Sequence, residues 1–258
     1  MLTSVRSILA ASIFATTAAI SVPALAQVTN PADEVSEDSG IGIEFSANAA
    51  IVSEYRFRGV DLSGGDIAIQ GGIDLGLPAG FYVGTWGSSI DEDTVGYGHT
   101  ELDVYGGWSG EFGLISTDVG VIAYIYPNAG AGEFDYVEFY GSVGAGLGPA
   151  EVTLGVAYAP SQDSLDFGGG EDDNLYLYTD VGVGIGPVTV TGHLGWTDGV
   201  LTYTDDGEAF DYSVGAEAAV PGTPLSVAIA YVGAEGDYGF GDYEFTEDTV
   251  VLTLSASF

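Results

Sequence analysis

Apolar and polar residues alternate with a period of two through most of the chain, and no other feature of the sequence restricts the fold as strongly. In residues 250–258 every second position is Val, Leu, Ala or Phe, while Thr and Ser occupy most of the positions between them. The same alternation begins at about residue 41 and recurs in segments separated by Gly, Pro and Asp. Successive side chains of a β-strand point to opposite faces, so this pattern predicts an all-β protein whose strands have one apolar and one polar face.

The spacing of these segments predicts how the strands are connected. Strands of roughly ten residues give twelve segments, at 43–57, 66–77, 80–90, 99–109, 113–125, 134–146, 150–160, 174–185, 187–197, 209–220, 224–234 and 247–258. Five short links contain the Gly and Pro that tight turns require, at 78–79, 110–112, 147–149, 186 and 221–223. Six longer, polar and acidic links lie between them, at 58–65, 91–98, 126–133, 161–173, 198–208 and 234–246. This alternation places all long loops on one rim, and the short turns with both termini on the other.

An even number of antiparallel strands with one apolar face, short turns at one rim and long loops at the other is typical of a bacterial outer-membrane barrel. A sheet in a bilayer must close on itself, because lipid cannot satisfy the backbone groups of a free edge. We therefore predict a transmembrane, antiparallel, up-and-down β-barrel of twelve strands with both termini periplasmic. A water-soluble β-sandwich or barrel also alternates, but its apolar face points inward. The last strand, which ends in Phe258, favours the membrane barrel and predicts outer-membrane lipid and the barrel-assembly machinery as partners.

The first 26 residues have the features of a secretory signal peptide. Arg6 is their only charged residue, residues 8–22 form an apolar stretch that consists mainly of small and aliphatic residues, and Ala24-Leu25-Ala26 supplies a small-x-small cleavage site. A membrane-anchoring helix is the alternative, which Pro23 and the cleavage site disfavour. We expect residues 1–26 to be a removed signal peptide, 27–40 a flexible acidic periplasmic lead-in, and 41–258 a barrel in the outer membrane of a Gram-negative bacterium.

The composition excludes several classes of function. The chain has no cysteine, so thiol catalysis and Cys-zinc sites are excluded. It has 3 Lys+Arg against 38 Asp+Glu and a formal net charge of −35. This balance argues against a nucleic-acid partner, because phosphate contacts need Lys and Arg. It also disfavours basic contacts to lipopolysaccharide phosphates and leaves bridging by divalent cations as a hypothesis.

Catalytic, metal and cofactor sites are not indicated. A lipid-modifying barrel would need a nucleophile beside a base, but the two histidines, His99 and His193, lie in no recognisable nucleophile motif. Acidic clusters contain the oxygen ligands that calcium prefers, at 91–93, 171–173, 205–206 and 247–248. None has the spacing of an EF-hand, so solvated loops are the favoured interpretation. We therefore expect no enzyme activity, no cofactor and no bound metal.

Motifs spread along the chain resemble a known family. The first half contains SEYRFRGV (53–60), QGGIDLG (70–76), GFYVGTWGSSID (80–91) and ELDVYGGW (101–108). Further along lie YPNAG (126–130), YVEFY (136–140) and GHLGWTDG (192–199). In these motifs and their order, over nearly the whole mature chain, the sequence resembles the TorF family of porin-like outer-membrane proteins. The resemblance implies a channel architecture and a localisation, but no particular solute, because the solutes of this family are mostly unassigned.

The polar face of the predicted strands points into the barrel and carries many ionisable residues. The predicted pore-lining residues are Glu54, Arg56, Arg58, Asp74, Glu101, Asp103, Asp118, Glu138, Asp180, His193 and Glu217. Unpaired buried charge is expensive. Arg56 and Arg58 therefore either pair with several of these acids in a structural role or form one wall of a charged constriction opposite carboxylates. Since rings of Asp and Glu favour cations in a pore, we predict a porin-like channel for passive diffusion of small solutes with weak cation selectivity.

Twelve strands lie between barrels that side chains fill and barrels with a wide aqueous channel. The alternative is therefore a non-conducting structural or adhesive barrel with acidic surface loops. The sequence names neither the solute nor the oligomeric state, and it leaves open whether a loop folds inward as a plug. Aromatic residues near strand ends are expected in girdles at the membrane interfaces: Tyr55, Phe57, Phe81, Tyr82, Trp108, Trp196, Phe210 and Tyr212.

Overall fold

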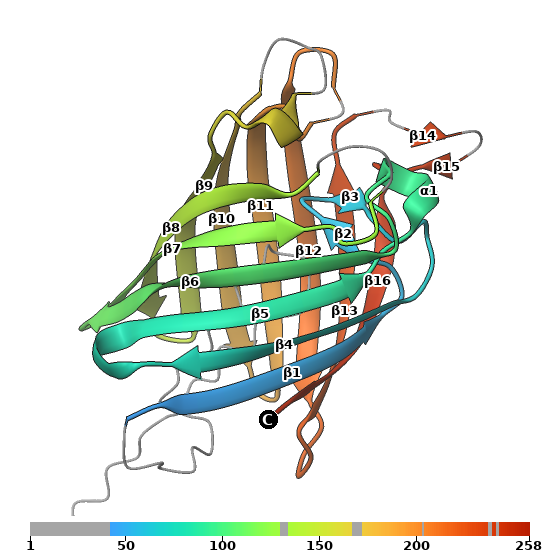
Figure 1. Cartoon of the computed structure of the whole chain (residues 1–258). Coiled ribbons are helices and arrows are strands. Elements are labelled where there is room, and N and C mark those ends of the chain that lie inside the picture. The colour runs from blue at the N-terminus through green and yellow to red at the C-terminus, as the bar shows by residue number, and fades with distance from the viewer. Residues whose placement is uncertain (1–41, 130–133, 167–171, 203, 237–238, 241–242) are drawn as a thin grey trace, which may run out of the picture.

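A computed structural model describes residues 42–129, 134–166, 172–202, 204–236, 239–240 and 243–258, which form a closed β-barrel (Figure 1). The barrel strands are β1 (Glu44–Val52), β4 (Ala68–Gly76), β5 (Phe81–Ser89), β6 (Thr100–Phe112), β7 (Ile115–Ile125), β8 (Tyr136–Leu147), β9 (Ala150–Ala159), β10 (Asn174–Ile185), β11 (Val188–Gly199), β12 (Glu208–Ala219), β13 (Leu225–Ala234) and β16 (Thr249–Ser257). Each strand pairs antiparallel with its neighbours along the chain, and β1 closes the ring by pairing with both β4 and β16. This confirms the predicted all-β, up-and-down barrel of twelve strands. The expected signal peptide and lead-in, residues 1–40, lie outside the described residues.

The remaining elements are short and belong to the connections. A two-stranded sheet joins β2 (Arg56–Phe57) to β3 (Val60–Asp61), and another joins β14 (Gly239–Phe240) to β15 (Tyr243–Glu244). The helical turns are η2 (Pro78–Gly80), α1 (Glu92–Val95) and η3 (Asp163–Leu165). Among the described residues, no helix combines the length and the apolar character needed to cross a membrane.

The short connections turn tightly because a glycine in each takes a left-handed backbone conformation that other residues adopt at a cost. These glycines are Gly80, Gly113, Gly148, Gly186 and Gly222, with φ between +65° and +84°. The predicted link at 110–112 is wrong, because β6 continues to Phe112 and the chain reverses at residues 113–114. The C-terminal end of β16 lies at the same rim as these short turns (Figure 1).

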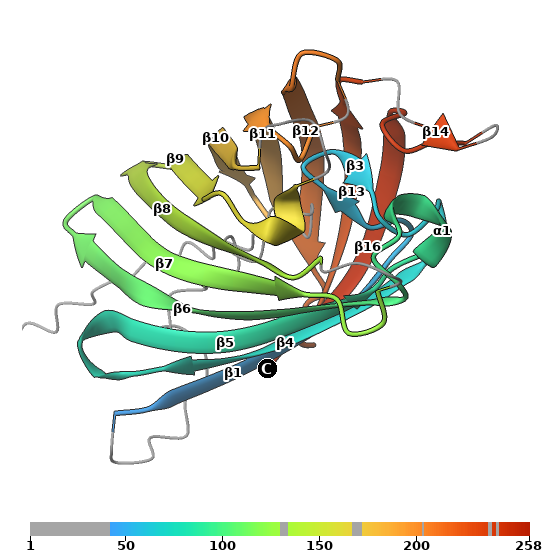
Figure 2. The same ribbon diagram turned by 45° about the horizontal axis from the view of Figure 1, so that its top comes forward.

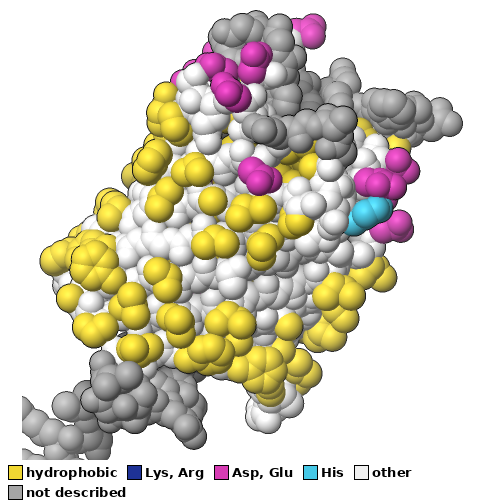
Figure 3. Space-filling model, viewed as in Figure 1, with side chains coloured by type: hydrophobic (Ala, Val, Ile, Leu, Met, Phe, Trp, Pro, Cys, Tyr) yellow, Lys and Arg dark blue, Asp and Glu magenta, His cyan; other side chains and the backbone are white. Residues whose placement is uncertain are grey.

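The apolar face of the barrel points outward. On β16, Val250 and Leu252 are 52% and 54% exposed, whereas Val251 and Thr253 between and beside them are 4% and 7% exposed. Apolar side chains are spread over the whole barrel wall in the view of Figure 3, and the acidic side chains in that view gather toward the long loops. A water-soluble sandwich would show the opposite orientation. The structure therefore has the surface of a barrel surrounded by an apolar solvent.

Tyrosines and glycines pack against each other on the interior face. Tyr105 on β6 lies opposite Gly84 on β5, and Tyr178 on β10 lies opposite Gly155 on β9. A methyl group added to either glycine would overlap with the ring of the tyrosine opposite. The richness in glycine therefore makes room for aromatic rings inside a narrow barrel. Tyr82, expected in an interface girdle, is one of these interior residues and is 5% exposed.

The first predicted strand, 43–57, is wrong in its last third, because the chain leaves the barrel wall after Val52. Residues 53–67, which we call the inner segment, include the β2–β3 hairpin, and Figure 2 shows this hairpin inside the ring of barrel strands. Tyr55 is consequently buried, and it does not belong to an outer girdle. An extended hairpin keeps the alternation of a strand, so the sequence pattern alone could not distinguish the two.

Candidate functional site

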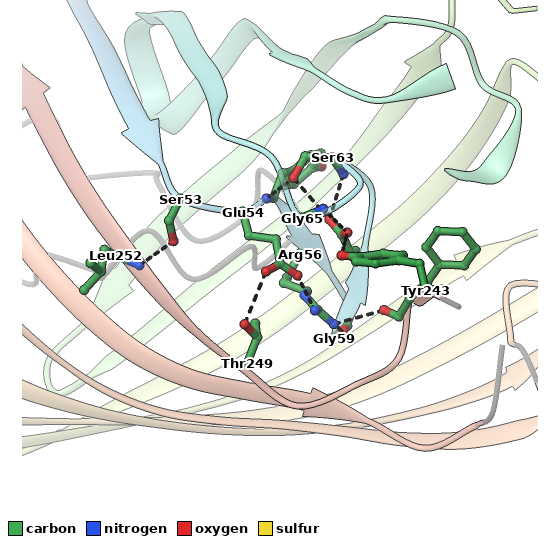
Figure 4. Close-up of polar contacts among 12 residues, drawn as sticks. Ser53, Glu54, Arg56, Gly59, Ser63, Gly65, Tyr243, Thr249 and Leu252 are labelled. Atoms are coloured by element: carbon green, nitrogen blue, oxygen red, sulfur yellow. Dashed lines mark hydrogen bonds and ion pairs between the residues drawn. The ribbon is translucent and has the colours of Figure 1, made fainter. Parts of the chain in front are cut away.

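Hydrogen bonds of the backbone tie the inner segment to β16 at its start and to two of the long connections further along. The Ser53 amide donates to the carbonyl oxygen of Leu252 on β16 over 2.8 Å, and the Leu252 amide donates to Ser53 Oγ over 2.9 Å (Figure 4). Further along, the Asp61 amide donates to the carbonyl oxygen of Phe245 over 2.9 Å, and the Asp91 amide donates to that of Leu62 over 2.9 Å. The segment is thus a docked part of the interior.

The carboxylate of Asp61 holds the turn that follows β3. Its oxygens accept hydrogen bonds from the Ser63 amide at 2.8 Å, from Ser63 Oγ at 3.1 Å and from the Gly65 amide at 2.7 Å. The hydroxyl of Tyr243 also donates to it (Figure 4). Side-chain acceptors of this kind replace the backbone partners that a tight turn lacks. Asp61 was not among the predicted pore-lining residues, although the Asp-x-Ser-Gly-Gly pattern at 61–65 is a recognisable turn signal.

Glu54 and Arg56 form an ion pair inside the segment (Figure 4). Arg56 Nη1 also donates to the carbonyl oxygens of Gly59 at 3.0 Å and Phe245 at 2.9 Å, and Thr249 Oγ1 donates to Glu54 Oε2 at 3.2 Å. Burial raises the pKa of Glu54 above its ordinary value, and this effect outweighs the opposing effect of Arg56. The predicted pairing of Arg56 with an acid is present, but within the segment, and both residues lie off the wall strand on which they were expected.

Arg58 reaches across the interior to the opposite wall. Its Nη2 lies 2.7 and 2.8 Å from the two carboxylate oxygens of Glu138 on β8. Its guanidinium carbon lies 4.2 Å from the ring centroid of Tyr176 on β10, and 4.8 Å from that of Phe57. Arg58 is 5% exposed and Glu138 is fully buried. The backbone of Arg58 has φ +49°, a left-handed conformation that costs a non-glycine residue roughly 1–2 kcal/mol.

A second contact between the inner segment and the wall lies beside the first. Tyr55 donates to Glu101 Oε1 on β6 at 2.6 Å, and Tyr126 donates to Glu101 Oε2 at 3.0 Å. Asp103 follows on the same face of β6, is 1% exposed, and has an Oδ1 with no hydrogen-bond partner. Its carboxyl group lies close to those of Glu101 and Glu138. This part of the wall therefore holds three acidic side chains, Glu101, Asp103 and Glu138, beside the single guanidinium of Arg58.

His193 on β11 lies between two carboxylates. Its Nδ1 is 2.6 Å from Asp180 Oδ1, and its Nε2 is 2.9 Å from Asp211 Oδ1 and 2.8 Å from the hydroxyl of Tyr176. An imidazolium can donate from both nitrogens, which suits this geometry. The sequence placed Asp180 and His193 in the interior but omitted Asp211. Its position on the polar face of the predicted strand 209–220 was the signal for it.

The other predicted site residues lie apart from these clusters. Asp74 accepts a hydrogen bond from Tyr105 at 2.5 Å, and Asp118 accepts one from Tyr82 at 2.8 Å. Glu217 is 5% exposed, and its Oε2 has no partner. The structure thus distributes the predicted carboxylates over several levels of the interior. Within the described ranges, no three His, Asp or Glu side chains are grouped so that they could hold a metal ion.

Comparison with solved structures identifies barrels of the same architecture. The NanC porin has a TM-score of 0.56 at 10% identity, covering 83% of this chain and 98% of that one. The KdgM porin has a TM-score of 0.54 at 9% identity, with the same coverage. KdgM described in complex with disordered oligogalacturonate has a TM-score of 0.53 at 7% identity, covering 83% and 97%. At these identities the likeness is one of fold.

Comparison by sequence gives a family without an assigned activity. A family model described as a bacterial protein of unknown function (Gcw_chp) matches residues 36–258. The match supports neither the TorF name nor any particular solute. A search of curated proteins found no match.

Proposed function

Because the chain belongs to the Gcw_chp family of bacterial proteins, to which no function is assigned, we propose its function from the barrel itself. The protein is, on this proposal, a narrow porin-like channel for passive diffusion of small solutes, with a weak preference for cations. The charge of the interior carries this proposal. Two arginines, Arg56 and Arg58, are buried in the described part of the chain together with seven acids: Glu54, Asp61, Glu101, Asp103, Glu138, Asp211 and Glu217. Fixed carboxylates in a pore favour cations over anions.

The similar barrels provide a useful contrast. KdgM is described in complex with oligogalacturonate, which is a chain of sugar acids and therefore a polyanion. A polyanion would meet carboxylates in this interior, since acids outnumber arginines among its buried residues. We therefore propose that this chain shares the barrel architecture but admits solutes of the opposite charge.

A second candidate function is a closed structural or adhesive barrel. It is favoured by the packing of the inner segment, because Tyr124, Glu138 and Tyr176 around it are at most 1% exposed. A barrel filled at this level would not conduct unless the inner segment moved. In this case the acidic outer loops would be the functional surface and would bind ions or partner proteins.

Recording from the purified protein in planar lipid bilayers under a potassium chloride gradient separates these functions. The channel proposal predicts a reversal potential displaced toward the equilibrium potential of potassium. A reversal potential displaced toward that of chloride would contradict cation preference. No conductance from the wild type, with conductance from a variant that lacks Arg58, would favour the closed barrel with a removable plug.

The proposal includes the cellular placement expected from the sequence and from the TorF resemblance. The chain is exported with residues 1–26 removed and resides in the outer membrane of a Gram-negative bacterium. Both termini face the periplasm, and the assembly machinery recognises the last strand, which ends in Phe258. The channel has no catalytic step and uses no cofactor. An epitope inserted in residues 27–40 should be protected from protease in intact cells; digestion without permeabilisation would contradict this orientation.

A further inference from the structure

The place that Arg58 occupies on the far wall is built by residues of the barrel strands and not by the inner segment. Glu138 on β8 supplies two carboxylate oxygens. Tyr124 on β7 donates to Glu138 Oε2 at 3.2 Å and orients it, and Tyr176 on β10 supplies an aromatic face at 4.2 Å. We call Tyr124, Glu138 and Tyr176 the guanidinium site. Its parts belong to three wall strands, so the site does not depend on the inner segment for its existence.

The chemistry of the guanidinium site selects an organic cation over other solutes. A buried carboxylate beside an aromatic face matches a planar guanidinium, which binds carboxylates through paired hydrogen bonds and stacks on aromatic rings. The described residues contain no grouping of three His, Asp or Glu side chains suited to a metal ion. Anions are disfavoured, since Glu101 and Asp103 on β6 place two further buried acidic groups nearby and Arg58 is the cation that already occupies the site.

The wall offers more acidic groups than Arg58 contacts. Asp103 is 1% exposed and its Oδ1 has no hydrogen-bond partner. Arg58 itself fills the site incompletely, because its Nε and Nη1 are buried without partners. It also reaches the site from a left-handed backbone conformation that arginine does not favour. Arg58 therefore behaves as a tethered and imperfect occupant.

We propose that the guanidinium site is a binding site for the guanidinium or primary ammonium group of a small organic cation, and that Arg58 occupies it as an internal competitor. This inference rests on the proposed channel function for its biological meaning, since it names the class of solute that the channel admits. A solute that displaces Arg58 takes over its contacts with Glu138 and Tyr176. The inner segment is then released from the far wall. A tethered group competes at an effective concentration on the order of millimolar, so solute binding to the wild type is weak.

Chemical rescue of a variant without the Arg58 side chain tests the proposal. Arg58→Gly empties the site and suits the positive φ of this position. The probe is methylguanidinium chloride, added to the purified full chain in detergent micelles while thermal unfolding is followed. We expect the midpoint of Arg58→Gly to rise by about 2–4 °C, and the wild type to need roughly tenfold more probe for the same rise. Sodium chloride at equal ionic strength and urea, which is planar but uncharged, serve as controls.

Matched variants make the result decisive. The double variant Arg58→Gly with Glu138→Gln should lose the response to methylguanidinium, because the carboxylate that holds the cation is gone. An equal response to sodium chloride, or a response that persists in the double variant, would overturn the proposal. Arg58→Asn tolerates the same backbone conformation and replaces Arg58→Gly if that variant does not fold. The assay involves no conduction, so a barrel that proves closed can still show rescue, and a conducting barrel without rescue refutes this inference alone.

Discussion

Neutralising Glu138 should release the inner segment while leaving the barrel intact. Arg58 is 5% exposed, and in the docked state of Glu138→Gln its guanidinium still lies beside Tyr176 but has lost its only carboxylate partner among the described hydrogen bonds. Removing one partner of a buried ion pair costs about 3–5 kcal/mol. The amide oxygen of Gln can still accept one hydrogen bond, which restores about 1 kcal/mol. The docked segment should therefore lose about 3 kcal/mol, or roughly a hundredfold in its docking equilibrium.

A cysteine in the inner segment measures this change directly, because the chain has none of its own. Val60 is buried at 8% exposure, and cysteine is a conservative replacement for a small apolar residue. In the Val60→Cys background, Glu138→Gln should raise the rate of labelling by a maleimide about a hundredfold, following the docking equilibrium. The thermal midpoint of the barrel should change far less, because the strand ladders do not involve this ion pair.

Glu217→Gln is the matched control for this experiment. It removes the charge of another buried carboxylate, on β12, that has no contact with Arg58 among the described interactions. Its labelling rate should stay within about threefold of the parent. If Glu138→Gln also stayed within that range, the backbone contacts of the inner segment would suffice to dock it, and the reasoning from the ion pair would fail.

Three further predictions follow from the packing, the protonation and the second wall contact. Gly155→Ala should lower the free energy of unfolding by about 1–3 kcal/mol, because the added methyl group overlaps with the ring of Tyr178. The control Gly192→Ala adds its methyl group into open space and should change this free energy little. Equal losses for the two variants in urea titrations would contradict this prediction. Burial raises the pKa of Glu54, so the docked segment binds a proton more tightly than the undocked one, and docking weakens as the pH rises through the raised pKa. Labelling of Val60→Cys, corrected with a free thiol at each pH, should therefore slow on acidification, and less so in Glu54→Gln; an identical pH profile would show that other groups are responsible. Tyr55→Phe removes the hydroxyl that donates to a buried carboxylate of β6 and should speed labelling about tenfold; an unchanged rate would show that this contact does not hold the segment.

The barrel was predictable because its signals are local. The side-chain period of a strand decides which of its residues face lipid. Accordingly, the alternating apolar positions within 247–258 lie on the outer face of β16. The alternation of short and long links likewise follows from the up-and-down topology. Turn positions were less certain, since Gly110 and Gly113 are both turn formers and only Gly113 adopts the left-handed conformation.

The interior was predictable in its polarity but not in its partners. The sequence placed Glu138 and Arg58 on inward-facing positions, yet the two lie 80 positions apart and no sequence signal indicates that their side chains meet. It placed tyrosines both inside and in the girdles, and Tyr82 shows that the girdle position was wrong. An aromatic residue near a strand end fits both the membrane interface and the barrel interior. Which glycine lies opposite it on the neighbouring strand is known only once the pairing register of the two strands is known.

The sequence by itself determined that the chain closes into a barrel with its apolar face outward. Every strand must place apolar side chains toward lipid and polar side chains toward the interior, whichever strands it pairs with. Only the tertiary structure decided that residues 53–67 leave the wall and carry Arg58 across to β8 and β10. A strand in the wall and a hairpin inside it have the same alternation and differ only in their partners. Those partners are brought together by closure of the ring, which joins residues far apart in the chain and which no local pattern records.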